Sequence, residues 1–183
     1  MKLPEFITPN LITVARLLFV PVGVYTLFKN GGSDPTWQYI SWVVFFLLGL
    51  SDIADGNLAR SRNSITEFGK FLDPVADKVM IAAAMISLSI LDRLPWWITV
   101  VILAREIGIT LFRLSIIKRG VIAANKGGKI KSAFQNFGVG FYVLPLGSNL
   151  FWFRDAFMAI AVVLTIATGI YYVQSALRPH HLS

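Results

Sequence analysis

Residues 52–77 have the sequence DIADGNLARSRNSITEFGKFLDPVAD, and this stretch decides how the chain folds. An uncharged run, residues 35–51, precedes it, and a second one, residues 79–91, follows it closely. Half of the chain's ten acidic residues lie within the stretch, whereas both flanking runs are as apolar as membrane-spanning helices. The stretch is therefore predicted to connect two spans, together with their charged ends, at one boundary of a bilayer.

The composition of the whole chain agrees with a membrane protein. Of its 183 residues, 55% are hydrophobic and only 15% are charged, against about a quarter in a soluble domain. Disorder is excluded and an ordinary soluble globule is disfavoured. The absence of cysteine excludes disulfides, thiol catalysis, iron–sulfur clusters and cysteine-bound zinc.

The hydrophobic runs predict an all-α integral membrane protein, a bundle of six transmembrane helices in one domain, residues 1–183. The third and fourth spans contain charged residues, because the third begins at Asp73 and the fourth includes Arg105 and Glu106. Residues 1–9 are expected to form a short interfacial segment. The spans are predicted at about residues 11–28, 36–58, 73–92, 95–117, 132–153 and 156–177.

Turn residues divide these runs. Clusters at residues 30–35 and 92–95 predict turns, and residues 149–155 are expected to link the last two spans. Pro74 belongs in a first helical turn, so the third helix is expected to begin just before it. Pro145 is expected inside the fifth span, where neighbouring helices tolerate a kink.

The distribution of lysine and arginine predicts the orientation. With both termini cytoplasmic, the inner segments hold fourteen of the seventeen basic residues, and the outer ones hold only Lys29, Arg93 and Arg154. The net charge of +7 thus faces membrane lipids on one side and does not indicate a nucleic-acid partner. A multi-pass protein of the cell membrane is expected, with its active site at the cytoplasmic face.

Four aspartates predict a metal site. Asp52 and Asp55 are three apart and Asp73 and Asp77 are four apart, so each pair shares a helix face. Clustered carboxylates in an apolar setting need a counter-charge, and a hard divalent cation supplies one. The lack of nearby histidine and cysteine disfavours zinc. The alternative is that each aspartate pairs with a basic neighbour such as Arg60.

The residues between the two pairs suit a bound phosphate. Gly56 and Ala59 allow the backbone to approach a bulky ligand, and Gly69 lies one turn before Asp73. Arg60 places a guanidinium beside the carboxylates, suited to a phosphate held by metal ions.

These residues spell Asp-x-x-Asp-Gly-x-x-Ala-Arg, eight further residues, then Gly-x-x-x-Asp-x-x-x-Asp, a pattern that resembles the signature of the CDP-alcohol phosphotransferase family. The resemblance implies displacement of CMP from a CDP-linked lipid with two Mg²⁺ or Mn²⁺ ions bound by Asp52, Asp55 and Asp73. It also implies that Asp77 is the general base and touches one metal, and that the enzyme is a homodimer. The implied CDP-lipid residues are Asn10, Thr13, Arg16, Gly56, Ala59, Arg60, Thr66 and Gly69.

A second basic group predicts an acceptor site. Arg105 and Arg113 lie two helical turns apart on one face, and an unpaired arginine within a membrane is costly. Glu106 is expected to point elsewhere on the helix. The group that could hold a phosphate dianion comprises Arg105, Arg113, Lys129, Lys131 and Gln135.

Two stretches, residues 104–113 and 128–135, are similar to the phosphatidylglycerophosphate synthase branch of that family. This resemblance implies that CDP-diacylglycerol and sn-glycerol 3-phosphate give phosphatidylglycerol phosphate and CMP. Inositol phosphate, or phosphatidylglycerol in cardiolipin synthesis, are alternative acceptors. A divalent-cation transporter is a remote alternative, disfavoured because Arg60 would repel cations and no repeat is found.

Overall fold

The computed structural model describes residues 9–61, 67–116 and 126–177, with side chains described for residues 11–51, 75–112 and 130–175. The described residues form six α-helices and contain no strand, which confirms the all-helical prediction. Two 3₁₀ turns, Lys29–Gly32 and Ser148–Leu150, lie before α2 and α6. The helices are α1 (Pro9–Phe28), α2 (Pro35–Ser61), α3 (Glu67–Ile90), α4 (Trp96–Ile116), α5 (Lys126–Val143) and α6 (Phe151–Leu177).

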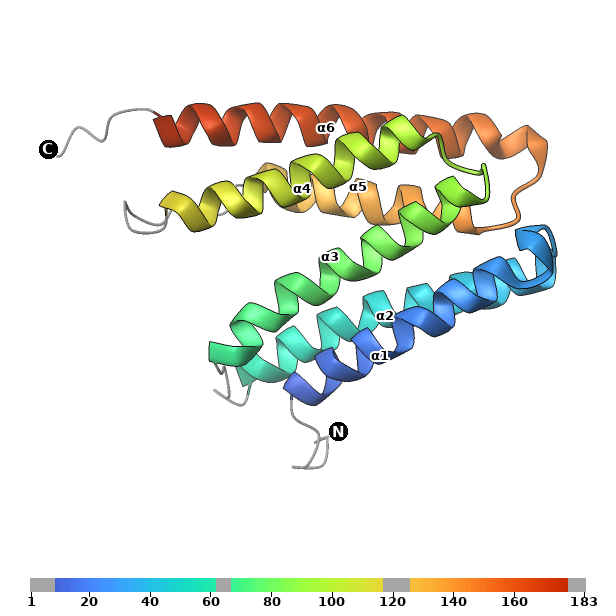
Figure 1. The fold of residues 1–183 in the computed structure, drawn as a ribbon, viewed down its shortest axis with the longest axis horizontal. Coiled ribbons are helices and arrows are strands. Elements are labelled where there is room, and N and C mark those ends of the chain that lie inside the picture. The colour runs from blue at the N-terminus through green and yellow to red at the C-terminus, as the bar shows by residue number, and fades with distance from the viewer. Residues whose placement is uncertain (1–8, 62–66, 117–125, 178–183) are drawn as a thin grey trace, which may run out of the picture. The chain divides into compact units, whose positions relative to one another are not determined.

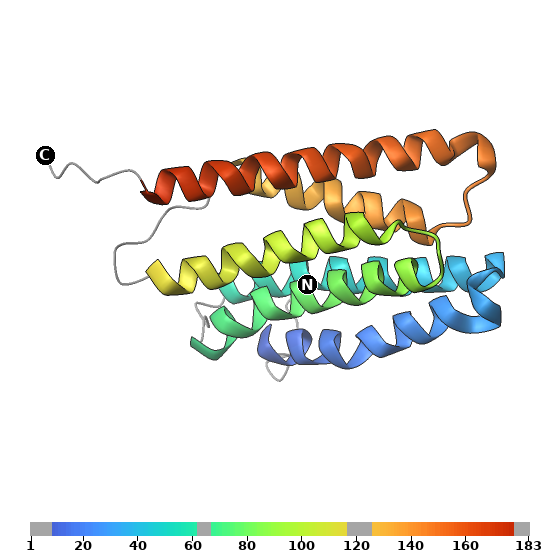
Figure 2. The same cartoon turned by 45° about the horizontal axis from the view of Figure 1, so that its top comes forward.

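The chain divides into two compact units. The first is Met1–Leu94 with Tyr142–Pro145, and the second is Pro95–Phe141 with Leu146–Ser183. Within the first unit α1, α2 and α3 run side by side, and α1 packs against both of the others (Figures 1 and 2). Within the second unit α4 packs along α6 (Figure 1).

One buried cluster of the first unit joins its three helices and consists of Val20, Leu48 and Met80. Gly23 of α1 allows the ring of Phe45 on α2 to approach closely, because a Cβ at this position would lie 3.0 Å from the ring's Cζ atom. Small residues at helix contacts are typical of membrane bundles, where close packing replaces the hydrophobic effect between helices.

The predicted turn before α2 is confirmed. Asn30, Gly31 and Gly32 have left-handed backbone conformations, with φ of 53°, 68° and 73°, which glycine and asparagine adopt at low cost. Asp34 caps α2, since its Oδ1 accepts the Thr36 N–H at 2.9 Å. Hydrogen bonds from the Asn30 side chain and then from this N–H hold the pKa of Asp34 below its ordinary value.

The start of α3 differs from the prediction. The helix begins at Glu67, so Pro74 lies in its interior and not in its first turn. An interior proline removes one backbone hydrogen bond, and neighbouring helices offset that loss in membrane bundles. The proline is therefore a poor marker of this helix boundary.

The end of α5 also differs from the prediction. α5 ends at Val143, so Pro145 follows the helix, and the break before α6 comes earlier than residues 149–155. Proline disfavours the α conformation for the residue before it, here Leu144. Gly147, two residues after Pro145, has an extended backbone. Arg93 Nη2 donates to the backbone oxygens of Leu144, at 3.1 Å, and Val143, at 3.4 Å. These bonds satisfy carbonyls that the end of a helix leaves without partners.

Among the described residues, two helical stretches are long and apolar enough to cross a membrane, Leu11–Gly32 and Ser148–Ser175. Leu11–Gly32 contains the first predicted span, and Ser148–Ser175 covers most of the sixth.

Candidate active site

Two helices of the first unit carry the acidic motif. Helical backbone runs through Asp52 and Asp55 in α2 and through Asp73 and Asp77 in α3, so each pair shares a face. Carboxylate oxygens are the ligands that Mg²⁺ and Mn²⁺ prefer, so this donor set fits a divalent cation. The described side chains alone include no group of three metal ligands, and those of Asp52, Asp55 and Asp73 lie outside them.

The other predicted CDP-lipid residues of α2 and α3 are placed by their backbone. Gly56, Ala59 and Arg60 continue α2 beyond Asp55, and Gly69 lies in the first turn of α3. Asn10 lies in the first turn of α1. The side chains of Asn10 and Arg60 are outside the described set, and Thr66 lies wholly outside the described residues.

Arg16 links α1 to the acidic motif. Its side chain is buried, with 1% of the residue exposed, and its Nε–H donates to Ser51 Oγ of α2 at 3.1 Å. Ser51 immediately precedes Asp52, and its own hydroxyl donates to the Leu48 oxygen at 2.7 Å. Thr13, one turn before Arg16, is fully buried. The structure thus brings Arg16, one of the predicted CDP-lipid residues, to the part of α2 where the motif begins.

Asp77 occupies the edge of the three-helix core. It is half-buried on α3, between fully buried Ala76 and the core residue Met80, one turn on. A half-buried carboxylate on a helix has a fixed backbone position and keeps part of its surface exposed. This placement suits a group that exchanges a proton with a bound molecule.

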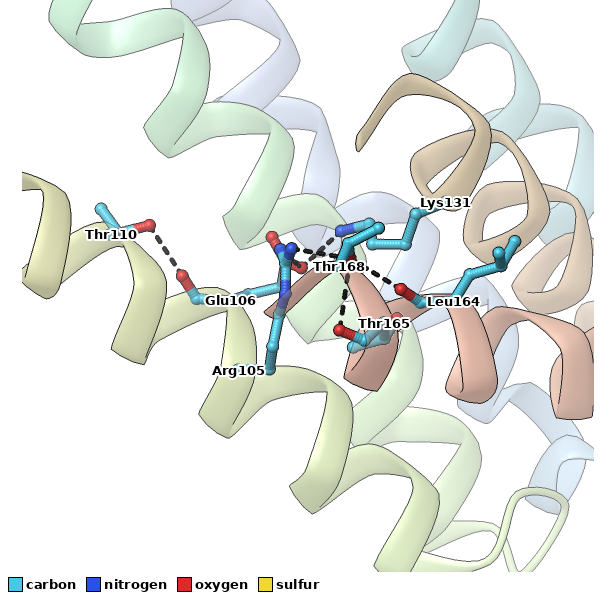
Figure 3. Close-up of polar contacts among 7 residues, drawn as sticks. All are labelled: Arg105, Glu106, Thr110, Lys131, Leu164, Thr165 and Thr168. Carbon is cyan, nitrogen blue, oxygen red and sulfur yellow. Dashed lines mark hydrogen bonds and ion pairs between the residues drawn. The ribbon is translucent and has the colours of Figure 1, made fainter. Parts of the chain in front are cut away.

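The second unit contains a polar cluster that joins three helices (Figure 3). Glu106 Oε1 on α4 accepts from Arg105 Nη1 at 2.9 Å and from the ammonium of Lys131 on α5. Arg105 Nη2 donates to Thr168 Oγ1 on α6 at 2.9 Å, and that hydroxyl donates to the Leu164 oxygen at 2.6 Å. The side chains of Arg105, Glu106 and Lys131 are 19%, 15% and 4% exposed.

The expected direction of Glu106 was wrong. Adjacent helical residues diverge by about 100°, which suggested that Glu106 faces away from Arg105. Both side chains are long enough to reach the same point between the helices, as Figure 3 shows. Glu106, Ser51 and Thr168 were all missed as site neighbours. Glu106 alone carried a signal, because an acidic residue within an apolar run needs a cationic partner.

The remaining predicted acceptor residues lie on α4 and α5. Gln135 follows Lys131 by one turn, is 4% exposed, and its Oε1 has no hydrogen-bond partner among the described residues. Arg113 belongs to α4 and Lys129 to α5, while their side chains lie outside the described set. The structure therefore places Arg105 and Lys131 together and puts Gln135 on the same face of α5 as Lys131.

An apolar cleft of about 570 Å³ lies between α4 and α6. Gly169 on its α6 wall leaves room for the Arg105 side chain, because a Cβ there would lie 3.3 Å from Arg105 Cγ. Gly108 on the α4 wall has open space beside it. The cleft is lined by Arg105, Gly108, Ile109, Phe112, Ile166, Gly169, Ile170, Val173 and Gln174.

Comparisons with known proteins identify the family. The model of the CDP-alcohol phosphatidyltransferase family matches residues 6–167. A protein named "Probable phosphatidylglycerophosphate synthase" in Mycobacterium tuberculosis (strain ATCC 25618 / H37Rv) is 46% identical over 92% of this chain and 81% of its own. Two further relatives are named CDP-diacylglycerol–glycerol-3-phosphate 3-phosphatidyltransferase. The one in Bacillus subtilis (strain 168) is 35% identical over 90% of this chain and 92% of its own. The one in Haemophilus influenzae is 33% identical over 94% of each chain. The chain therefore belongs to the CDP-alcohol phosphatidyltransferase family.

Proposed function

We propose that this enzyme transfers the phosphatidyl group of CDP-diacylglycerol to sn-glycerol 3-phosphate, giving phosphatidylglycerol phosphate and CMP. The observation that carries the proposal is similarity over 90% or more of the chain to relatives named for this reaction. The acidic motif on α2 and α3 supplies the residues that such a transfer needs.

We assign the transfer step to the acidic motif. Asp52, Asp55, Asp73 and Asp77 would hold two divalent cations, Mg²⁺ or Mn²⁺, which when bound supply positive charge to the pyrophosphate and the leaving CMP. Asp77 accepts the proton of the acceptor's sn-1 hydroxyl as that oxygen forms its bond to the diacylglycerol-linked phosphorus. The bond from this phosphorus to the CMP oxygen breaks, so the electron pair leaves with CMP.

The CDP-lipid is held by residues around that motif. Arg16 and Arg60 are proposed to bind its phosphates, because a guanidinium donates paired hydrogen bonds to phosphate oxygens. The buried bond between Arg16 and Ser51 supports this role, since it fixes a cation beside the first aspartate of the motif. The full proposed set is Asn10, Thr13, Arg16, Gly56, Ala59, Arg60, Thr66 and Gly69.

The acceptor's phosphate is assigned to the basic residues of α4 and α5. The cluster of two cations and one carboxylate at Arg105, Lys131 and Glu106 carries a net charge of +1, which attracts a phosphate dianion. The full proposed set is Arg105, Arg113, Lys129, Lys131 and Gln135.

We further propose that all six helices cross the membrane, with both termini and the active site at the cytoplasmic face, residues 1–9 at the interface and the enzyme a homodimer. Every helix exposes at least one large apolar side chain, as a bilayer favours and water does not. Examples with more than half of the residue exposed are Leu18, Leu47, Ile90, Leu111, Phe137 and Val163.

The proposal is tested with purified protein, CDP-diacylglycerol, Mg²⁺ or Mn²⁺, and a panel of alcohols. CMP release and a new lipid product are expected with glycerol 3-phosphate and not with inositol phosphate or phosphatidylglycerol. A lipid product from inositol phosphate alone would refute the acceptor, whereas no CMP release with any alcohol would refute the reaction. Omission of the divalent cation is expected to abolish turnover.

A further inference from the structure

Glu106 lies between Arg105 and Lys131, the two cations of the proposed acceptor site whose side chains are described. Its Oε1 accepts from Arg105 of the same helix at 2.9 Å and from Lys131 of α5, so one oxygen holds two cations from two helices (Figure 3). Thr110, one turn further on α4, donates to the backbone oxygen of Glu106 at 2.7 Å and does not touch the carboxylate.

The charge balance explains why an acidic residue stands in a site for an anion. Two cations with 19% and 4% of their side chains exposed repel each other, and each is costly in apolar surroundings. One carboxylate offsets one of these charges and leaves the cluster at +1. It also fixes two flexible side chains that would otherwise lose conformational entropy when a ligand binds.

Donors remain for a ligand after these bonds are made. An ammonium has three N–H groups, and Glu106 accepts one of those on Lys131. Arg105 donates to Glu106 and Thr168, while its buried Nε has no hydrogen-bond partner among the described residues. One helical turn after Lys131, the buried Oε1 of Gln135 also has no partner within the described part of the chain, but this oxygen is an acceptor and suits a ligand hydroxyl, not a phosphate oxygen.

We propose that Glu106 is a positioning residue: its carboxylate orients Arg105 and Lys131 so that their remaining donors bind the acceptor's phosphate. This inference rests on the proposed function, because it concerns the affinity for glycerol 3-phosphate. Glu106 acts through its two partners and does not itself contact the acceptor.

The test is the steady-state kinetics of Glu106→Gln, which keeps the shape of the side chain and removes its charge. KM for glycerol 3-phosphate is expected to rise about tenfold, the effect of losing one charge-assisted hydrogen bond. kcat and KM for CDP-diacylglycerol should stay within about twofold of the wild type. An unchanged or lower KM for glycerol 3-phosphate, or a loss confined to kcat, would overturn the inference.

A double-mutant cycle separates positioning from general support of the fold. Lys131→Gln alone should also raise KM for glycerol 3-phosphate. If Glu106 acts through Lys131, the double variant should raise KM by clearly less than the product of the two single effects. Effects that multiply would mean that the two residues act independently and would contradict the inference.

Two further variants complete the design. Thr110→Val removes a hydrogen bond to the backbone of Glu106 and spares the carboxylate, so its KM values should match the wild type within about twofold. Glu106→Asp keeps the charge on a shorter side chain, should give an intermediate KM, and carries the test if Glu106→Gln does not fold. Unchanged KM in a foldable Glu106 variant would refute the positioning role alone. A wild-type enzyme without activity toward glycerol 3-phosphate would refute the proposed function and this role with it.

Discussion

At the scale of single residues, the proposed chemistry depends on one carboxylate that accepts a proton. Asp77 is half-buried on a rigid helix at the edge of the first unit's core. Asp77→Asn keeps an oxygen ligand but removes the base, so CMP release should fall by about 10²–10⁴-fold. The measurement is the initial rate of CMP release at saturating substrates and divalent cation.

The matched control for that change is Asp92→Asn. Asp92 is exposed in the turn between α3 and α4 and has a positive φ of 54°, which asparagine adopts as readily as aspartate. Its rate should equal that of the wild type. A wild-type rate in Asp77→Asn would remove Asp77 from the role of base.

Gly169 controls the path of Arg105, although it carries no side chain. A Cβ at Gly169 would lie 3.3 Å from Arg105 Cγ and 3.5 Å from Nε, so Gly169→Ala should displace the guanidinium. We expect KM for glycerol 3-phosphate to rise about threefold to tenfold, with KM for CDP-diacylglycerol unchanged. Gly108→Ala is the control, because it adds the same methyl group to the opposite wall of the cleft without a close contact. Equal effects of the two substitutions would contradict this role.

The sequence could predict which residues are polar within the spans but not which of them meet. Rules of helix spacing describe where Cβ atoms point, so they predict which positions three or four apart share a helix face. They fail for Arg105 and Glu106, whose long side chains converge although their Cβ atoms diverge. They also give no means to find Ser51, a residue on another helix that Arg16 contacts.

At the scale of helices, Arg93 secures the end of α5. Its guanidinium donates to the oxygens of Val143 and Leu144, which the break at Pro145 leaves without helical partners. Arg93→Met keeps much of the apolar stem and removes these donors. We expect it to lower the free energy of unfolding by about 1–3 kcal/mol, the usual value for hydrogen bonds from a charged group. Thermal unfolding in detergent measures the change.

The control for that change is Lys29→Met. Lys29 donates to Tyr25 Oη at 3.1 Å in an exposed contact on the turn before α2. Because exposed interactions contribute little, the loss of stability should be less than about 1 kcal/mol. If both variants unfold at the wild-type temperature, Arg93 does not secure the helix end.

A helix boundary could be predicted where the residues favour a single backbone conformation that ends a helix. Asn30, Gly31 and Gly32 adopt left-handed conformations, so the turn before α2 was correctly expected. Proline is ambiguous, since Pro74 lies inside α3 whereas Pro145 follows the end of α5. Pro145 lies in an uncharged run, where hydropathy carries no information about a break in the backbone, and Pro74 lies between Asp73 and Asp77, where charge does not show whether the helix has already begun.

At the scale of the whole molecule, the three basic residues predicted to face outward all bind groups of the protein. Lys29 contacts Tyr25 and the ring of Trp37, and Arg93 binds backbone oxygens. Arg154 pairs with Asp155 at 2.9 Å and lies over the Phe151 ring at 4.3 Å. Groups of the same chain therefore bind these three charges at the expected outer boundary. The prediction of orientation depends on the other fourteen basic residues, which are expected on the cytoplasmic side.

That orientation can be tested without altering the helices, because the chain contains no cysteine and any introduced thiol is unique. Ser33→Cys lies at an exposed turn position on the expected outer side, and Ser183→Cys lies at the terminus expected inside. In intact cells a membrane-impermeant maleimide should label only Ser33→Cys, and permeabilised cells should show both labelled. Ser148→Cys, in the exposed turn before α6, should behave as Ser33→Cys if an even number of spans separates the two positions. Labelling of Ser183→Cys in intact cells would refute cytoplasmic termini, and protection of Ser148→Cys alone would refute the six-span arrangement.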